Sequence, residues 1–261
     1  MRNPEGLDVR FLVGDVTDPD SLDLRSCSFQ LAVNIGCLHM IAETEDRDKT
    51  RDPICSLKTM KKTNLNTEQN NGIPAVFLDR DGTIIEDRGD SSDPSQVVFF
   101  RDTVSSLRCL SAHFALFIVT NQSGVAEGAI SMREVEHVNS HIRSYLSTHG
   151  ITFLATYVCP HKRVSGCPCI KPNPYFLKKA ERDFGIDLGR SFVIGDHPQD
   201  VELAINAGAN GIYLLSGHGM KHRDALSRGT EVARGIKEAA EIIRERVEAT
   251  RETENKRHTN T

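Results

Sequence analysis

The chain has 261 residues, of which 38% are hydrophobic and 26% are charged, and 32 Lys and Arg residues face 36 Asp and Glu residues. This slightly acidic balance gives little electrostatic support to broad nucleic-acid binding. No apolar run is long enough for a membrane span, and no signal peptide opens the chain. With seven cysteines and no secretory signal, we expect a cytoplasmic protein that is a monomer or small homo-oligomer.

Residues 1–42 contain two apolar segments, 9–18 and 29–41, which we expect to be strands with an acidic turn between them. They resemble the middle of class I S-adenosylmethionine-dependent methyltransferases. The glycine-rich loop that would precede them is absent, and the polar residues 43–72 stand where the closing strands would follow. Half a sheet has exposed edges and cannot enclose a cofactor. We therefore interpret residues 1–42 as an incomplete α/β fragment, a remnant or fusion, and residues 43–72 as a linker.

From residue 73 onwards, apolar strands alternate with amphipathic stretches, which predicts an α/β domain over 73–222: a Rossmann-like parallel sheet with helices on both faces. A helix over 230–249 should pack on this domain or mediate self-association, and residues 250–261 read as a disordered tail. We expect strands at 74–79, 114–119, 152–158, 191–195 and 210–215, and helices at 103–112, 131–148, 174–184 and 199–207.

The first of these strands ends in two aspartates, Asp79 and Asp81, followed directly by Gly82. Side chains alternate along a strand and glycine permits a sharp turn, so the two carboxylates should leave the strand end close together. Adjacent carboxylates repel each other unless a cation joins them, and Mg²⁺ prefers oxygen ligands. The alternative is a polar turn without chemistry.

Three later segments favour phosphoryl chemistry over a bare turn. The second strand ends in Thr120, whose hydroxyl can bind a phosphate oxygen beside a turn rich in backbone N–H groups. Lys171 stands just ahead of a helix, where it can neutralise phosphate charge. Asp196 follows another strand and can complete a metal site, with Asp200 as a more distant partner. All of them fall at the carboxyl ends of strands, where open α/β sheets bind ligands.

This ordered set resembles the phosphatases of the haloacid dehalogenase superfamily. The resemblance covers about residues 73–220 and implies a Mg²⁺-dependent phosphomonoesterase without a large cap domain. It implies that Asp79 is the nucleophile that forms an aspartyl-phosphate and that Asp81 is the general acid and base. The implied Mg²⁺ ligands are Asp79, the backbone carbonyl of Asp81, and Asp196. Thr120 and Lys171 would hold the phosphoryl group.

A second cluster holds three cysteines and a histidine within eleven positions: Cys159, His161, Cys167 and Cys169. Thiolates and imidazole are the preferred ligands of Zn²⁺, and two short knuckles can close around one ion. The alternatives are free thiols or a disulfide. Because Lys171 lies two positions beyond the last cysteine, a structural Zn²⁺ would hold the loop that carries it.

The zinc pattern is similar to the branch that contains D-glycero-D-manno-heptose 1,7-bisphosphate 7-phosphatases and histidinol-phosphate phosphatases. That branch implies substrate contacts by Arg80, Asn121, Gln122 and Ser123. It also implies hydrolysis of the 7-phosphate of the heptose bisphosphate, with histidinol phosphate or another small sugar phosphate as alternatives. Ile170 and His197 depart from its pattern, where basic residues are common. An alternative of another class is an inactive phosphatase fold that binds or regulates a partner.

Overall fold

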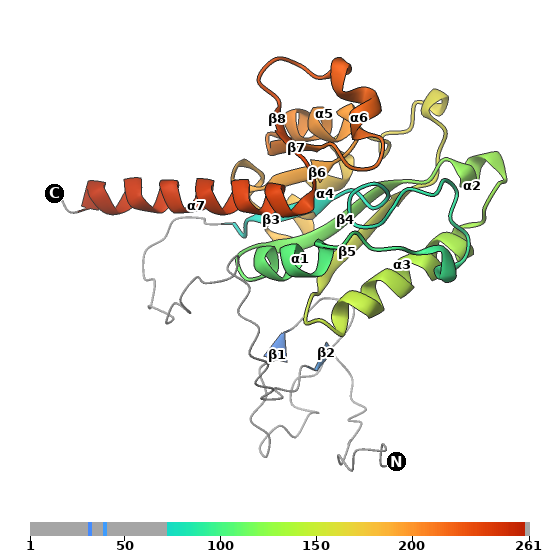
Figure 1. The fold of residues 1–261 in the computed structure, drawn as a ribbon, viewed down its shortest axis with the longest axis horizontal. Helices are drawn as coiled ribbons and strands as arrows, with labels where there is room; N and C mark the ends of the chain where they lie inside the picture. Colours follow the sequence, from blue (N-terminus) through green and yellow to red (C-terminus); the bar gives the residue numbers. More distant parts are fainter. Residues whose placement is uncertain (1–30, 33–38, 41–71, 259–261) are drawn as a thin grey trace, which may run out of the picture. The chain divides into compact units, whose positions relative to one another are not determined.

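The computed structural model of the chain describes residues 31–32, 39–40 and 72–258 (Figure 1). Contacts divide the chain into two units, Met1–Thr50 and Arg51–Thr261. In the first unit, β1 (Leu31–Ala32) pairs antiparallel with β2 (His39–Met40), within a segment expected to form one strand. The rest of the methyltransferase-like segment, and the expected linker up to residue 71, lie outside the described residues.

The second unit contains a six-stranded sheet with the order β5-β4-β3-β6-β7-β8, and every neighbouring pair is parallel. From β3 the chain adds β4 and β5 on one side, and later β6, β7 and β8 on the other. The point between β3 and β6 is therefore a topological switch point, where loops diverge and a crevice opens at the carboxyl ends of the strands. The strands are β3 (Ala75–Leu78), β4 (Ala115–Asn121), β5 (Phe153–Cys159), β6 (Phe192–Gly195), β7 (Asn210–Leu214) and β8 (Glu231–Ala233).

Helices cover both faces of this sheet, because alternate residues of each strand point to opposite sides. Val76 and Leu78 face a core shared with α1, α3 and α7, whereas Ala75 and Phe77 face a core shared with α4 and α5 (Figure 1). The helices are α1 (Thr103–Ser111), α2 (Gly124–Glu127), α3 (Met132–Ser147), α4 (Tyr175–Phe184), α5 (Pro198–Ala207), α6 (Gly219–His222) and α7 (Ile236–His258). The predicted α/β fold is thus confirmed, and each strand and helix predicted between residues 73 and 215 lies within two residues of its expected bounds.

The residues after 222 differ from the expectation of a helix over 230–249 and a disordered tail. Residues 231–233 form β8, which pairs with β7, and the helix begins at Ile236 and continues to His258. Ala239, Ala240 and Ile243 are buried in the core that contains α1. The expectation that this helix packs on its own domain is confirmed, and residues 231–243 complete the sheet and its core.

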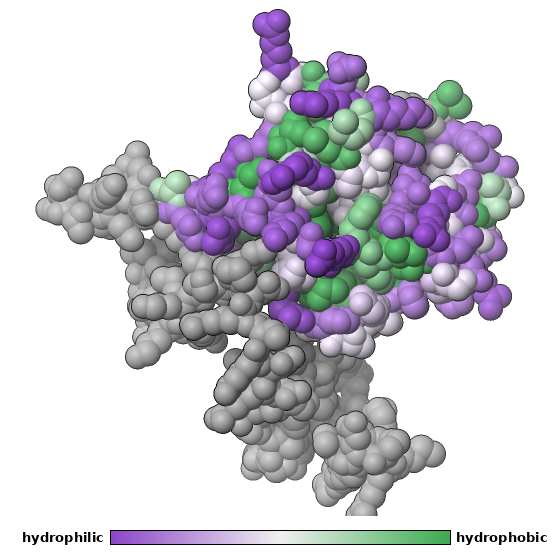
Figure 2. Space-filling view, viewed as in Figure 1, coloured by the Kyte–Doolittle hydropathy of each residue, from purple (hydrophilic) through white to green (hydrophobic). Residues whose placement is uncertain are grey.

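The described surface is mostly hydrophilic on the face shown in Figure 2, with hydrophobic side chains in separate patches. Within the described part of the chain, no helix combines the length and the apolar character needed to cross a membrane.

Candidate active site

The sharp turn after β3 places Asp79 and Asp81 at the carboxyl edge of the sheet, as their spacing predicts. Gly82 has a φ of 77°, a left-handed conformation that glycine adopts without strain. A Cβ atom at this position would lie 2.1 Å from Oδ2 of Asp196, which follows β6. The glycine therefore serves two purposes: it turns the chain and it leaves room for a carboxylate from the neighbouring strand.

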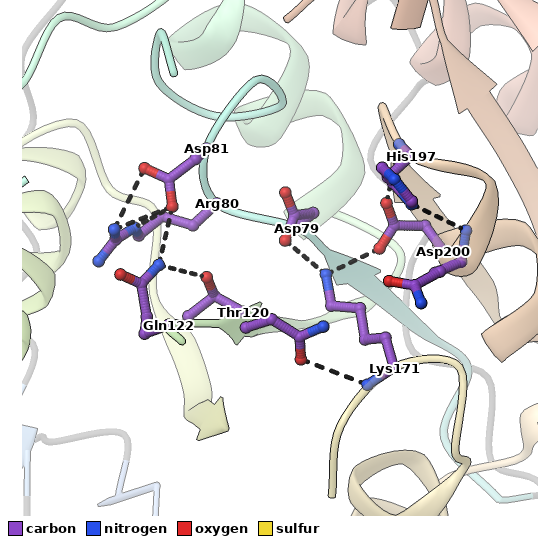
Figure 3. A network of polar contacts seen from close by, with 10 residues as sticks. Asp79, Arg80, Asp81, Thr120, Gln122, Lys171, His197 and Asp200 are labelled. Atoms are coloured by element: carbon purple, nitrogen blue, oxygen red, sulfur yellow. Dashed lines mark hydrogen bonds and ion pairs between the residues drawn. The ribbon is translucent and has the colours of Figure 1, made fainter. Parts of the chain in front are cut away.

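Lys171 connects two carboxylates that come from different elements (Figure 3). Its Nζ atom forms a short contact with Oδ1 of Asp79 and lies 2.7 Å from Oδ1 of Asp200, in the first turn of α5. The other oxygen of Asp200 accepts a hydrogen bond from the backbone N–H of His197 at 3.1 Å. Lys171 and Asp200 are almost fully buried, so this ion pair is shielded from solvent.

A second network holds the carboxylate of Asp81 apart from Lys171 (Figure 3). Nε of Arg80 donates to Oδ2 of Asp81 at 2.9 Å, and its Nη2 donates to Oδ1 at 3.1 Å. The side-chain amide of Gln122 donates to Asp81 and to the hydroxyl of Thr120, both at 2.9 Å. The carboxylate thus accepts three hydrogen bonds, which fix its orientation at the edge of the crevice.

Asp196 is held at the crevice by the loop that follows β7. The backbone N–H of His218 donates to Oδ2 of Asp196 at 2.7 Å. Gly217 has a φ of 52°, and a Cβ atom there would lie 2.2 Å from the same oxygen. The carboxyl ends of β3, β6 and β7 therefore all contribute to the surroundings of this carboxylate.

Burial controls the electrostatics of the three strand-end aspartates. It raises the pKa of Asp79 to about 6, with the Lys171 ammonium opposing the shift. It raises the pKa of Asp196 to about 8, with the charge of Asp79 adding to the effect. Burial also raises the pKa of Asp81, although the Arg80 guanidinium acts in the opposite direction. Burial alone would lower the pKa of Lys171, but the carboxylates of Asp200 and Asp79 raise it above its ordinary value.

Three carboxylates meet closely enough to hold one cation. Single oxygens of Asp79, Asp196 and Asp200 all lie within 4.8 Å of one another, and a divalent cation with oxygen ligands would offset their mutual repulsion. Two of these three residues belong to the predicted Mg²⁺ set. Asp200, expected as a more distant partner, contributes its carboxylate to the cluster, whereas the side chain of Asp81 lies in the second network.

The second predicted cluster also comes together. Ligand atoms of Cys159, His161, Cys167 and Cys169 lie within 4.8 Å of one another, and Sγ of Cys167 is 3.0 Å from Nδ1 of His161. Three sulfurs and one imidazole are a donor set that fits tetrahedral Zn²⁺. The cluster is linked to the site, because Lys171 follows directly and its backbone N–H donates to Oδ1 of Asn121 at 3.3 Å.

The crevice is a cavity of about 640 Å³ that is lined by residues of both networks. Thr120, Asn121, Gln122 and Ser123 line it, but Arg80 does not: its side chain is fully buried behind Asp81. The residues that line the cavity are Asp79, Asp81, Asp87, Gly89, Asp90, Thr120, Asn121, Gln122, Ser123, Glu127, Lys162, Val164, Ile170, Lys171, Asp196, His197, Gln199, Asp200 and His218.

His197 and Ile170, the two residues that depart from the pattern of the branch, have structural roles. His197 is the N-cap residue of α5, and its Nδ1 accepts a hydrogen bond from the backbone N–H of Gln199 at 3.3 Å. Ile170 is 7% exposed and packs against Cys159 and Cys167. Each residue therefore stabilises its own loop, while also forming part of the cavity wall.

Sequence reasoning assigned no role to three residues beside the site. Asp87 and His218 line the cavity and face each other, with Oδ2 of Asp87 3.3 Å from Nδ1 of His218. Asn139 of α3 accepts a hydrogen bond from Nη1 of Arg80 at 2.9 Å. A signal for Asn139 was available, because it is an amide in the apolar stripe of a predicted helix. No local pattern gave a role to Asp87 or His218.

Comparisons with known proteins find related sequences and a related fold. A family model described as HAD-hydrolase-like matches residues 168–239. A curated protein of Thermoplasma acidophilum, named "Probable D-glycero-D-manno-heptose-1,7-bisphosphate 7-phosphatase", is 38% identical over 141 residues, covering 53% of this chain and 88% of the relative. D-glycero-beta-D-manno-heptose-1,7-bisphosphate 7-phosphatase of Escherichia coli K12 is 33% identical over 143 residues, covering 52% of this chain and 75% of the relative.

A solved structure shares the fold over most of its length. D,D-heptose 1,7-bisphosphate phosphatase from B. bronchiseptica, in complex with magnesium and phosphate, superposes with a TM-score of 0.62 at 26% sequence identity. The match covers 67% of this chain and 99% of that chain.

Proposed function

Because the chain belongs to the haloacid dehalogenase-like phosphatases and is a phosphoric monoester hydrolase, we propose that it is Mg²⁺-dependent and forms an aspartyl-phosphate on Asp79. The observation that carries this proposal is the meeting of Asp79, Asp196 and Asp200 at the switch point of the sheet, with Lys171 beside them. The similar B. bronchiseptica protein, solved with magnesium and phosphate, supports the Mg²⁺ dependence in this proposal.

In the proposed reaction, a carboxylate oxygen of Asp79 attacks phosphorus while the bond from phosphorus to the leaving oxygen breaks. Asp81 gives a proton to that oxygen, and afterwards removes a proton from the water that hydrolyses the aspartyl-phosphate. Lys171 and Thr120 bind the phosphoryl oxygens; the ammonium of Lys171 also favours the ionised, nucleophilic form of Asp79.

Mg²⁺ would be held by carboxylates of the cluster and would supply positive charge where the phosphoryl group carries negative charge. A structural Zn²⁺ would be held by Cys159, His161, Cys167 and Cys169. Its proposed contribution is to fix the loop between β5 and α4, which contains Lys171.

The leading substrate is D-glycero-D-manno-heptose 1,7-bisphosphate, hydrolysed at its 7-phosphate. The similar curated proteins carry this activity in their names. A bisphosphate needs a cation for the phosphate that is not cleaved, and Lys162 supplies one in the cavity wall. The second candidate is histidinol phosphate, because Asp87, Asp90 and Glu127 also line the cavity and would attract an amine-bearing substrate.

Phosphate release with Mg²⁺ from a panel of substrates tests these proposals. The panel contains both anomers of heptose 1,7-bisphosphate, histidinol phosphate and simple sugar phosphates, compared by kcat/KM. Preference for one heptose bisphosphate supports the leading substrate and identifies the anomer. Preference for histidinol phosphate replaces it with the second candidate, and equal rates with and without Mg²⁺ after a weak-chelator wash would contradict the metal assignment.

A further inference from the structure

Asn139 interrupts the apolar face of α3. The other buried residues of this helix include Val135, Val138, Ile142 and Leu146, all at helical spacing. An amide buried among such side chains is costly unless it forms hydrogen bonds. Asn139 is fully buried, its Oδ1 accepts a hydrogen bond from Arg80, and its Nδ2 has no hydrogen-bond partner. The hydrogen bond from Arg80 is therefore the one side-chain hydrogen bond that offsets the cost of burying this amide.

Arg80 is a fully buried cation whose planar guanidinium donates hydrogen bonds to two residues. Nε and Nη2 donate to the two oxygens of Asp81, and Nη1 donates to Asn139, 59 positions further along the chain. The guanidinium is rigid and planar, so a hydrogen bond at one nitrogen fixes the direction of the others. The hydrogen bond to Asn139 thus fixes the orientation of the guanidinium relative to the carboxylate of Asp81.

We propose that Asn139 is a positioning residue that acts through Arg80 to orient the general acid Asp81. The inference rests on the proposed function, in which Asp81 donates the proton. As an oxygen of Asp79 bonds to phosphorus, the bond from phosphorus to the leaving oxygen breaks, and the proton of Asp81 moves to that oxygen. The chain of contacts from α3 to Asp81 holds this donor at the edge of the cavity.

A purely structural role for Asn139 predicts something different. If the amide only stabilises the buried Arg80, its removal lowers the amount or the stability of folded enzyme and slows all substrates alike. If it positions the proton donor, its removal slows substrates in proportion to their need for that proton. Alkoxide leaving groups need it, whereas nitrophenolate leaves readily without it.

The test compares kcat/KM for an alkyl phosphate and for p-nitrophenyl phosphate in folded Asn139→Leu enzyme. This parameter reports the steps up to cleavage of the substrate and so isolates the proton donation. We expect the alkyl phosphate to lose about tenfold or more relative to the aryl phosphate. Equal losses on both substrates would overturn the proposal. Asn139→Ala removes the same acceptor and provides the comparison if the Leu variant does not fold.

Two further variants separate this proposal from its premise. Asp81→Asn should itself show a larger loss on the alkyl phosphate; if it does not, the acid role of Asp81 fails, and the inference fails with it. In an Arg80→Met background, adding Asn139→Leu should leave the substrate ratio unchanged, because the connection is already cut. A further change in that ratio would show that Asn139 acts by another route.

The matched control is Ser191→Ala. Ser191 is also fully buried, and its hydroxyl accepts a hydrogen bond from the backbone N–H of Ala75 at 2.9 Å, at the opposite end of β3 and β6. We expect this variant to lose stability without any change in the substrate ratio. A selective loss in this control would mean that the ratio reports general destabilisation, which would contradict the assignment of Asn139.

Discussion

The ammonium of Lys171 lies 2.7 Å from Oδ1 of Asp200, and both side chains are almost completely removed from solvent. Removal of Asp200 leaves the buried ammonium with Asp79 as its remaining carboxylate partner and takes away the acceptor of the backbone N–H of His197. We expect Asp200→Ala to lower the free energy of unfolding by about 2–3 kcal/mol, because hydrogen bonds to a charged group are lost in a buried site. The exposed pair of Lys179 and Asp183 is the control, because Lys179→Ala should cost less than about 1 kcal/mol. Denaturant unfolding of both variants measures the difference, and equal costs would contradict it.

Asp79→Asn should abolish turnover while the fold is retained. The amide keeps the size of the side chain but removes the nucleophilic carboxylate, so we expect kcat to fall by about four orders of magnitude or more. Circular dichroism and thermal unfolding check the fold, and Asp93→Asn, which changes an exposed helix cap, is the control. Substantial turnover by the Asp79 variant, free of reverted protein, would refute the nucleophile assignment.

Without added divalent cations, stability should fall as the pH rises. The folded-state pKa values of Asp79 and Asp196 are raised from 3.8 to about 6 and about 8, mainly by burial. Between the unfolded-state pKa and the folded-state pKa of each group, the native state therefore binds more protons than the unfolded state, and stability falls as the pH rises across that interval. We expect the Tm of Asp196→Asn to exceed that of the wild type by an amount that grows from about pH 4 to about pH 8 and then levels off.

Added Mg²⁺ provides the complementary measurement for this pH effect. It binds the native carboxylates and should raise the wild-type Tm at the upper end of the range, narrowing the gap to Asp196→Asn. A gap that is constant across the pH range would show that ionisation of Asp196 does not oppose folding.

Purified protein washed with a weak chelator should contain about one Zn²⁺ per chain. Cys167→Ser removes a thiolate from the cluster and should lose this metal, whereas Cys109→Ser should keep it, because Cys109 lies outside the cluster. Loss of the metal should also lower phosphatase activity, since Lys171 follows the cluster directly. The zinc content per chain is measured for the wild type, Cys167→Ser and Cys109→Ser. A metal-free wild type would contradict the zinc assignment.

Lys162→Ala should discriminate a bisphosphate from a monophosphate. Lys162 and Lys171 are the two lysines in the cavity wall, and Lys171 is already paired with carboxylates. We expect KM for heptose 1,7-bisphosphate to rise about tenfold, as the loss of a charge-assisted contact implies, with a smaller change for heptose 7-phosphate. Lys178→Ala, on the exposed face of α4, is the control. Equal changes for both substrates would exclude Lys162 as the second phosphate contact.

Much of the fold was predictable because the strands of a parallel sheet are short, apolar and separated by amphipathic helices. Strands β3 to β7 and the strand-end aspartates follow that pattern. β8 does not: Glu231, Val232 and Ala233 make a strand of only three residues, directly before a helix. Its apolar residues fit the helical period that continues into α7, so only pairing with β7 distinguishes it as a strand.

The site was predictable where chemistry follows a strand end, and less so where it depends on contacts between distant elements. Asp79, Thr120 and Asp196 are marked by the strands before them. The burial of Arg80 depends on its contact with α3, which the resemblance to the phosphatase branch did not indicate when it implied a substrate contact for this residue. The carboxylate of Asp200 joins the cluster because α5 begins beside Lys171, which local sequence does not reveal.

Because β3 lies between β4 and β6, the sheet around Asp79 cannot be completed early in the synthesis of the nascent chain. Asp79 leaves the ribosome early, but the neighbours that make it a member of a carboxylate cluster belong to β6 and α5, which are synthesised much later. Until β6 is synthesised, β3 lacks its neighbour on that side, and we expect the growing chain to have no phosphatase activity. The time at which phosphatase activity appears during cell-free translation would therefore report when β6 pairs with β3.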